Sequence, residues 1–107
     1  MPAVISIEGY VNQIVSQYTP GDTNWHKVPL PSGVLQGTIG VKVIMKSLDT
    51  SGILDGSLFL VNFNQASAPS VGFPVSGSGQ GLSITFNNSL WVKMSVSTDT
   101  VALLWYF

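Results

Sequence analysis

The chain has 107 residues, no cysteine, 8% charged residues and a net charge of −1. A chain of this length forms one domain, and without cysteine it has neither disulfides nor thiolate metal sites. Its four cationic residues are lysines that stand singly along the chain. A nucleic-acid partner requires a basic patch to neutralise phosphates, so we expect no nucleic-acid binding.

Low charge is combined here with 45% hydrophobic residues. Such a monomer has little charge to keep it soluble. One interpretation is a compact β-domain with a surface of serine, threonine and asparagine. The interpretation that we favour is a subunit whose apolar surface is covered by copies of itself or by a larger assembly. No segment approaches the ~20 apolar residues of a membrane span, and no basic signal-peptide region is visible, so we expect no membrane partner and no export.

The first half of the chain contains several strand candidates. Residues 10–18 fit helical spacing as well as strand propensity, and we interpret them as strand. Residues 25–30 include Pro29, which cannot donate to a ladder and therefore indicates a sheet edge. The candidates are 3–7, 10–18, 25–30 and 37–48. In the last of these, Lys42 and Lys46 share one face, which suggests a solvated face near an edge.

The second half contains 57–63, 71–75, 82–86 and the segment 90–107. Residues 57–63 are continuously apolar, which predicts a strand buried on both faces. Residues 90–107 alternate in polarity on either side of a polar turn at 97–100, which predicts a hairpin. Its second arm is apolar on both faces, so we expect this arm to be the central strand of a sheet.

Together these segments give about eight short strands with turn signals every 8–14 residues and no helix–strand alternation. The fold class predicted is all-β, with residues 1–107 forming a single antiparallel β-sandwich of jelly-roll or Greek-key type.

Two features of the sequence are close to catalytic signatures. The run Asp49-Thr50-Ser51-Gly52 is close to the Asp-Thr-Gly of aspartic proteases, but the additional residue before the glycine breaks the required turn, so we interpret it as an Asp-initiated turn. His26 is the only histidine, and no serine lies in a nucleophile elbow. We expect a protein that is not an enzyme and has no cofactor.

Two binding chemistries were considered next. Asp49 and Asp55 flank one loop and could hold calcium, but the EF-hand spacing is absent and we interpret the loop as polar without a metal. Trp25 and Trp91, with Asn87 and Asn88, could form a platform on which a pyranose ring stacks. A small carbohydrate-binding module or lectin is therefore the alternative function.

Three stretches carry a resemblance to a known class of protein. They are the opening, from Val11-Asn12-Gln13-Ile14 to Trp25-His26-Lys27-Val28-Pro29-Leu30-Pro31-Ser32-Gly33; the middle, with Val41-Lys42-Val43 and Leu54-Asp55-Gly56-Ser57-Leu58-Phe59; and the end, with Leu90-Trp91-Val92-Lys93 and Leu103-Leu104-Trp105-Tyr106-Phe107. In these the chain resembles the small all-β virion accessory proteins of tailed bacteriophages, which decorate or cement heads or form parts of head fibres. The resemblance implies a virion location, a homotrimer and a major capsid protein or other virion protein as partner.

The sequence therefore predicts contact with partners through the N-terminal segment, the loop 49–56, exposed tryptophans and the last strand. We expect Trp91 and the face formed by Leu104 and Tyr106 to be covered by a neighbouring subunit. The residues expected to bind partners are Ala3, Val4, Ile5, Trp25, Asp49, Leu54, Asp55, Trp91 and Tyr106.

Overall fold

The computed structural model describes residues 11–34, 41–76, 82–86 and 89–107. The regular structure in these ranges is β-strand. The strands are β1 (Gln13–Tyr18), β2 (His26–Lys27), β3 (Val41–Leu48), β4 (Leu58–Phe63), β5 (Phe73–Ser76), β6 (Leu82–Phe86), β7 (Leu90–Met94) and β8 (Thr100–Tyr106). Across the described ranges, no helix is long and apolar enough to cross a bilayer.

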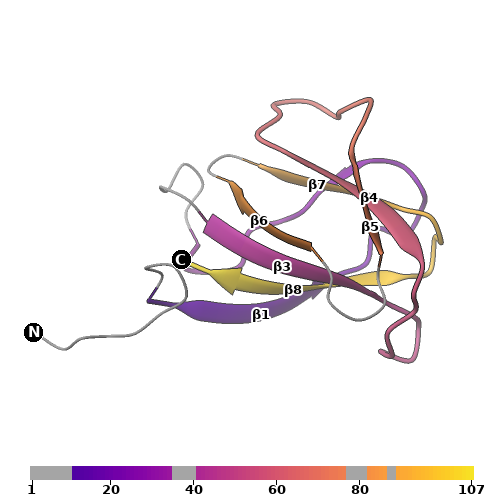
Figure 1. The fold of residues 1–107 in the computed structure, drawn as a ribbon, viewed down its shortest axis with the longest axis horizontal. Coiled ribbons are helices and arrows are strands. Elements are labelled where there is room, and N and C mark those ends of the chain that lie inside the picture. Colours follow the sequence, from indigo (N-terminus) through magenta and orange to yellow (C-terminus); the bar gives the residue numbers. More distant parts are fainter. Residues whose placement is uncertain (1–10, 35–40, 77–81, 87–88) are drawn as a thin grey trace, which may run out of the picture.

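The strands form two four-stranded sheets, which we call the first sheet (order β1-β8-β3-β6) and the second sheet (order β2-β7-β4-β5). Each pairing between neighbouring strands is antiparallel. Figure 1 shows β1, β8 and β3 side by side, with β7, β4 and β5 on the other side of the molecule. The predicted all-β sandwich of about eight strands is therefore confirmed.

One hydrophobic core lies between the sheets, because alternate side chains of each strand point inward. Val43 and Met45 of β3 are fully buried, as are Val61 and Val92 from the second sheet. The largest fully buried side chain is Trp105 of β8.

Trp105 is held by two specific contacts within this core. Its indole Nε1 donates a hydrogen bond to Ser16 Oγ of β1 at 2.7 Å. Its ring meets Phe86 of β6 edge to face, with 6.0 Å between ring centroids. The single polar atom of Trp105 thus has a partner despite complete burial, as buried indoles require.

The predicted hairpin over 90–107 is wrong. Its two arms are strands, but β7 pairs with β2 and β4 in the second sheet, whereas β8 pairs with β1 and β3 in the first. The connection between them therefore passes from one sheet to the other. Alternating polarity is a local property that marks a strand without specifying its partner, so an arch and a hairpin have the same pattern. The expectation that the last strand is central in its sheet is confirmed, since β8 lies between β1 and β3.

Two further expectations are corrected by the sheet order. β3 lies between β8 and β6 rather than near an edge, so Lys42 and Lys46 mark the outer face of an interior strand. β4 is not buried on both faces: Phe59 is 1% exposed, whereas Leu58 on the opposite face is 59% exposed. Apolar residues on both faces of a strand do not ensure cover on both.

The ambiguous segment 10–18 is strand from Gln13 to Tyr18, as predicted. The segment 25–30 is strand only over His26–Lys27 and forms an edge of the second sheet, in agreement with the expectation from Pro29. The predicted strand 3–7 lies outside the described residues.

Candidate functional site on the outer face of the first sheet

The outer face of the first sheet carries an apolar row across three adjacent strands. Residues opposite each other in neighbouring strands share a face, and Leu104 of β8 stands opposite Val15 of β1 and Ile44 of β3. We call these three residues the outer row. Val15 is 71% exposed, while Leu104 and Ile44 are half-buried. An apolar surface of this kind on the solvent side of a sheet is typical of an interaction site.

The outer row lines a shallow hollow with a volume of about 440 Å³. The residues that line it are Val15, Ile44, Lys46, Ala102, Leu103 and Leu104. Lys46 is the one charged residue among them, and it stands opposite Ala102 at the side of the row. The hollow therefore suits an apolar side chain of a partner better than a charged ligand.

The expected contact residue Trp25 is half-buried and packs against Gly72. A Cβ atom at Gly72 would lie 2.5 Å from Cη2 of the Trp25 ring. The ring thus occupies the space that the glycine leaves open. Trp25 therefore has a packing role within the chain. Because the side chain is only half-buried, part of the ring is still open to other contacts.

Trp91 lies on the outer face of the second sheet, opposite Lys27 of β2 and Asn62 of β4. It is half-buried, and its Nε1 donates to the carbonyl oxygen of Gln65 at 3.0 Å. The same carbonyl accepts a hydrogen bond from Ser89 Oγ at 2.7 Å. Trp91 and Ser89 together fasten the loop after β4 to β7.

In the loop between β3 and β4, Asp49 organises a turn. Its Oδ1 accepts hydrogen bonds from the backbone N–H groups of Ser51 and Ile53, and Gly52 has a φ of 82°. The Asp-initiated turn that we predicted is therefore present. Leu54, 44% exposed, forms a β-bridge with Leu48 and so returns the loop toward β3.

Asp55, at the end of this loop, faces a residue that sequence reasoning did not select. The pKa of Asp99 is raised, first by burial and then by hydrogen bonding and charge repulsion from Asp55. Asp99 is 2% exposed, and Ser47 Oγ donates to its Oδ2 at 3.4 Å. Asp55 also accepts hydrogen bonds from the N–H and Oγ of Ser57.

The carboxyl groups of Asp55 and Asp99 connect two parts of the fold, because Asp99 lies in the arch between β7 and β8. The described ranges contain no group of three or more His, Cys, Asp or Glu residues that could hold a metal ion. From the sequence, Asp49 and Asp55 are the two carboxylates that share a loop. In the structure, the carboxyl group that interacts with Asp55 is that of Asp99.

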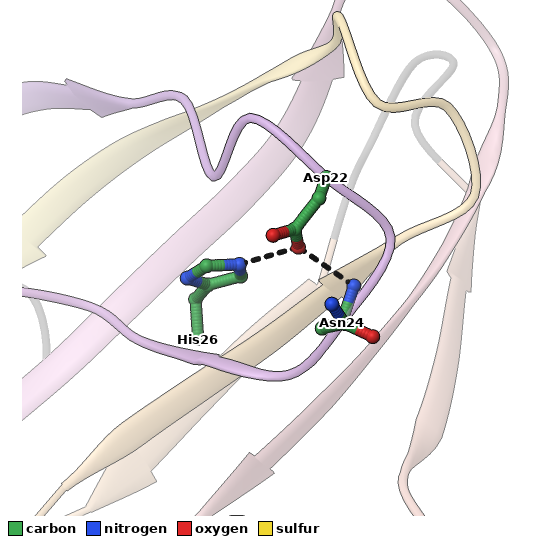
Figure 2. A network of polar contacts seen from close by, with 3 residues as sticks. All are labelled: Asp22, Asn24 and His26. Carbon is green, nitrogen blue, oxygen red and sulfur yellow. Dashed lines mark hydrogen bonds and ion pairs between the residues drawn. The ribbon is translucent and has the colours of Figure 1, made fainter.

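The single histidine, His26, contacts Asp22 in the loop between β1 and β2, as Figure 2 shows. Its Nε2 lies 2.6 Å from Asp22 Oδ1, and the backbone N–H of Asn24 donates to the same oxygen at 2.8 Å. The hydrogen bond from His26 is the largest cause that lowers the pKa of Asp22. The ring also meets Tyr18 edge to face at 6.4 Å. This arrangement ties the β1–β2 loop together.

Tyr106 is a correction to the expected contact residues, because it is only 7% exposed. It stands on the same face as Leu104 by strand alternation, but burial within the chain withholds its side chain from a partner. Of the two residues expected to be open to a neighbouring subunit on this face, only Leu104 has an accessible side chain. Ala3, Val4 and Ile5, and likewise Asn87 and Asn88, lie outside the described residues.

Sequence reasoning missed Val15 and Ile44 as candidate contact residues. The alternation in Gln13–Tyr18 separates Val15 from Ile14, so the pattern places them on opposite faces. Both residues are apolar, however, and the pattern alone does not say which one faces the core. The register with β8 decides it, since Ile14 stands opposite the buried Trp105.

The site is thus a shallow apolar surface on the first sheet, bordered by Lys46 and open at β1. Comparison of the chain with protein-family models, with curated proteins and with solved structures gave no match.

Proposed function

We propose that this chain is a non-enzymatic structural protein of a virus particle, which binds a capsid or another virion component and associates with copies of itself. The observation that carries the proposal is the outer row with its hollow of about 440 Å³. A partner that covers this surface removes apolar area from water, at roughly 25 cal/mol per Å². Each contact is modest, and many identical contacts on one particle make the attachment firm.

The strand order supports the same proposal. The first strand pairs with the last, the second with the second-to-last, and this pattern continues to the middle of the chain. The pairs are β1–β8, β2–β7, β3–β6 and β4–β5. We infer that the sandwich is a jelly roll, because a long hairpin rolled into two sheets produces this order. Jelly rolls occur in viral capsid proteins and in lectins.

The proposal is tested with particles of the virus whose genome encodes this chain. Purified particles are analysed by quantitative mass spectrometry, and recombinant protein is added to particles that lack it before sedimentation. We expect a fixed stoichiometry and recovery with the particles. Leu104→Lys, which places a charge in the hollow, is expected to reduce recovery at least tenfold, while Lys93→Ala on the second sheet leaves it unchanged. Absence of the chain from purified particles contradicts the proposal.

A glycan-binding role is the second candidate, and the half-exposed ring of Trp91 beside Lys27 and Asn62 is the observation that favours it. Aromatic rings at such positions stack on sugar rings. The test is a glycan array with the natural protein and the Trp91→Ala variant. Binding that is lost with Trp91 and occurs without any particle association would favour this candidate over the structural one.

A further inference from the structure

We propose that β1 is the self-association edge of this protein: two copies join antiparallel through β1, with a two-fold axis at Val15, so that their first sheets form one continuous sheet. This inference rests on the proposed function, which includes self-association, and it names the surface. The virion resemblance implies a trimer, whereas the edge described here favours a pair.

The backbone of β1 is the first support. Asn12 and Phe107 exchange two hydrogen bonds, with N···O distances of 2.8 and 3.1 Å. Bonded and non-bonded pairs alternate along an antiparallel ladder. The N–H and C=O groups of Gln13, Val15 and Gln17 therefore point away from β8. In the described residues no other strand pairs with β1 on that side.

The side chains along this edge form a palindrome. Gln13, Val15 and Gln17 lie on the outer face, and they read the same in both chain directions. In an antiparallel pair about Val15, Val15 meets its counterpart and Gln13 meets Gln17 of the second copy. Glutamine amides both donate and accept, so each such pair satisfies itself. A two-fold interface demands this self-complementarity.

Charge and continuity argue for the same occupant. β1 contains no charged residue, so two copies meet without repulsion. The outer row runs from Ile44 of β3 across Leu104 of β8 to Val15 at the open edge of the sheet. Pairing through β1 would join the outer rows of both copies into one apolar strip across the axis.

The edges of the second sheet are different. β2 has two residues, one of them Lys27, and Pro29 follows it; β5 includes Pro74. Short strands, lysine and proline are the features that block pairing between sheet edges. β1, with six residues and none of these features, is open by comparison.

The geometry of the pair shows which side chains contact the second copy. Neighbouring strands lie about 4.8 Å apart, so Val15 is the member of the outer row that lies against the second copy, while Leu104 and Ile44 lie one and two strands further away. The contact therefore consists of the backbone hydrogen bonds of β1 and the side chains of Gln13, Val15 and Gln17.

The first test uses two double variants at the same positions. Gln13→Glu with Gln17→Glu places like charges opposite each other in the proposed register, whereas Gln13→Lys with Gln17→Glu places opposite charges there and keeps the net charge of the natural chain. Masses are measured by light scattering over a concentration series, after circular dichroism has confirmed folding. We expect twice 11.4 kDa for the natural chain and the Lys/Glu variant, and 11.4 kDa for the Glu/Glu variant. A third variant, Gln13→Lys with Gln17→Lys, serves as a mixing control: added to Glu/Glu chains, it should restore the pair.

The second test uses cross-linking, which the absence of cysteine makes clean. Bonded antiparallel residues have Cα atoms about 5.5 Å apart, within reach of a disulfide. Val15→Cys should form covalent dimers at least tenfold faster than Val71→Cys, a matched control with 73% exposure against 71%. Equal rates, a trimer mass, a natural chain that stays monomeric, or a Glu/Glu variant that stays dimeric would each overturn the β1 pairing. A monomer that still sediments with virus particles overturns this inference and the proposed self-association, but leaves the proposed attachment to the virus particle standing.

Discussion

The two sheets are alike on their inner faces and differ at their edges. Both contribute fully buried residues to the core, such as Met45 from the first sheet and Val61 from the second. At the edges, the second sheet has a two-residue strand on one side and the proline-containing β5 on the other, while the first sheet has β1 on one side and β6 on the other, both without charged residues. The inner faces must be apolar in any β-sandwich, because they form its core. The edges are free of that constraint, and there the six-residue β1 differs from the short β2 and the proline-containing β5.

The largest expected effect comes from separating the inner and outer faces of β8. Trp105→Ala removes a fully buried ring together with its Ser16 and Phe86 contacts, and should lower the free energy of unfolding by about 3–5 kcal/mol. Leu104→Ala, one residue away on the half-buried outer face, should cost less than about 1.5 kcal/mol. Urea unfolding of both variants measures the difference. Equal losses would mean that the outer row is as much a part of the fold as the core.

The second sheet is tested at Gly72, where the Trp25 ring lies close to the backbone. In Gly72→Ala the new Cβ would lie 2.5 Å from the ring and 2.8 Å from the carbonyl oxygen of Val61. We expect a loss of about 1–3 kcal/mol in the free energy of unfolding, measured in urea. Combining it with Trp25→Ala should relieve the ring contact but not the backbone one. A stable Gly72→Ala variant would show that the second sheet adapts more readily than its contacts imply.

The junction between the sheets is tested at Asp99. Its pKa is raised in the folded state, so the folded protein takes up this proton at a higher pH than the unfolded chain does. Stability contributed by this group therefore rises as pH falls through the folded pKa and levels off below the ordinary value of about 3.9. Asp99→Asn should be more stable than the natural protein at pH 7, with an advantage that shrinks on acidification.

Thermal unfolding of Asp99→Asn between pH 7 and pH 3 measures this dependence. Asp55→Asn is the companion variant, since it removes the neighbour that helps to raise the Asp99 pKa, and it should flatten the same part of the profile. A natural protein that loses its Asp99-dependent stability as pH falls would have the opposite sign and would contradict the burial of this carboxyl group.

The smallest expected effect concerns the β1–β2 loop. His26→Ala removes the main cause that lowers the pKa of Asp22, so that pKa should rise toward its ordinary value. The carboxyl carbon of Asp22, followed by NMR during a pH titration, reports it directly. The hydrogen bond from the backbone N–H of Asn24 to Asp22 remains in this variant, and circular dichroism checks that the fold is retained. An unaltered pKa would assign the shift to the backbone of the loop instead.

Much of the fold could be predicted because strand alternation is a local property. The segments around Val43, Val61 and Leu103 were recognisable from spacing alone, and so was the sandwich class. Partner choice was not, as the arch at Asp99 shows: the same alternation fits two strands in one sheet or in two. Which face of β1 is inward was also undetermined, because Ile14 and Val15 are both apolar.

The candidate site was less predictable than the fold. Tyr106 was expected to be exposed because its face also holds Leu104, but cover from the surrounding chain differs along one strand. Asp99 was assigned to a polar turn, and its burial beside Ser47 arises only when the two sheets close. Properties that depend on residues far apart in the chain leave no pattern in either segment.

The pairing of β1 with β8 has a consequence for the order of events during synthesis. In the part of the chain that the structure describes, these are the first and last strands, and β8 is also the neighbour of β3. Until residues 100–106 have left the ribosome, β1 and β3 have no common partner, and the first sheet cannot assemble. The nascent chain therefore carries unpaired apolar strands until β8 emerges. Late closure of this kind slows folding and exposes the chain to aggregation, so cellular chaperones are expected to influence its yield.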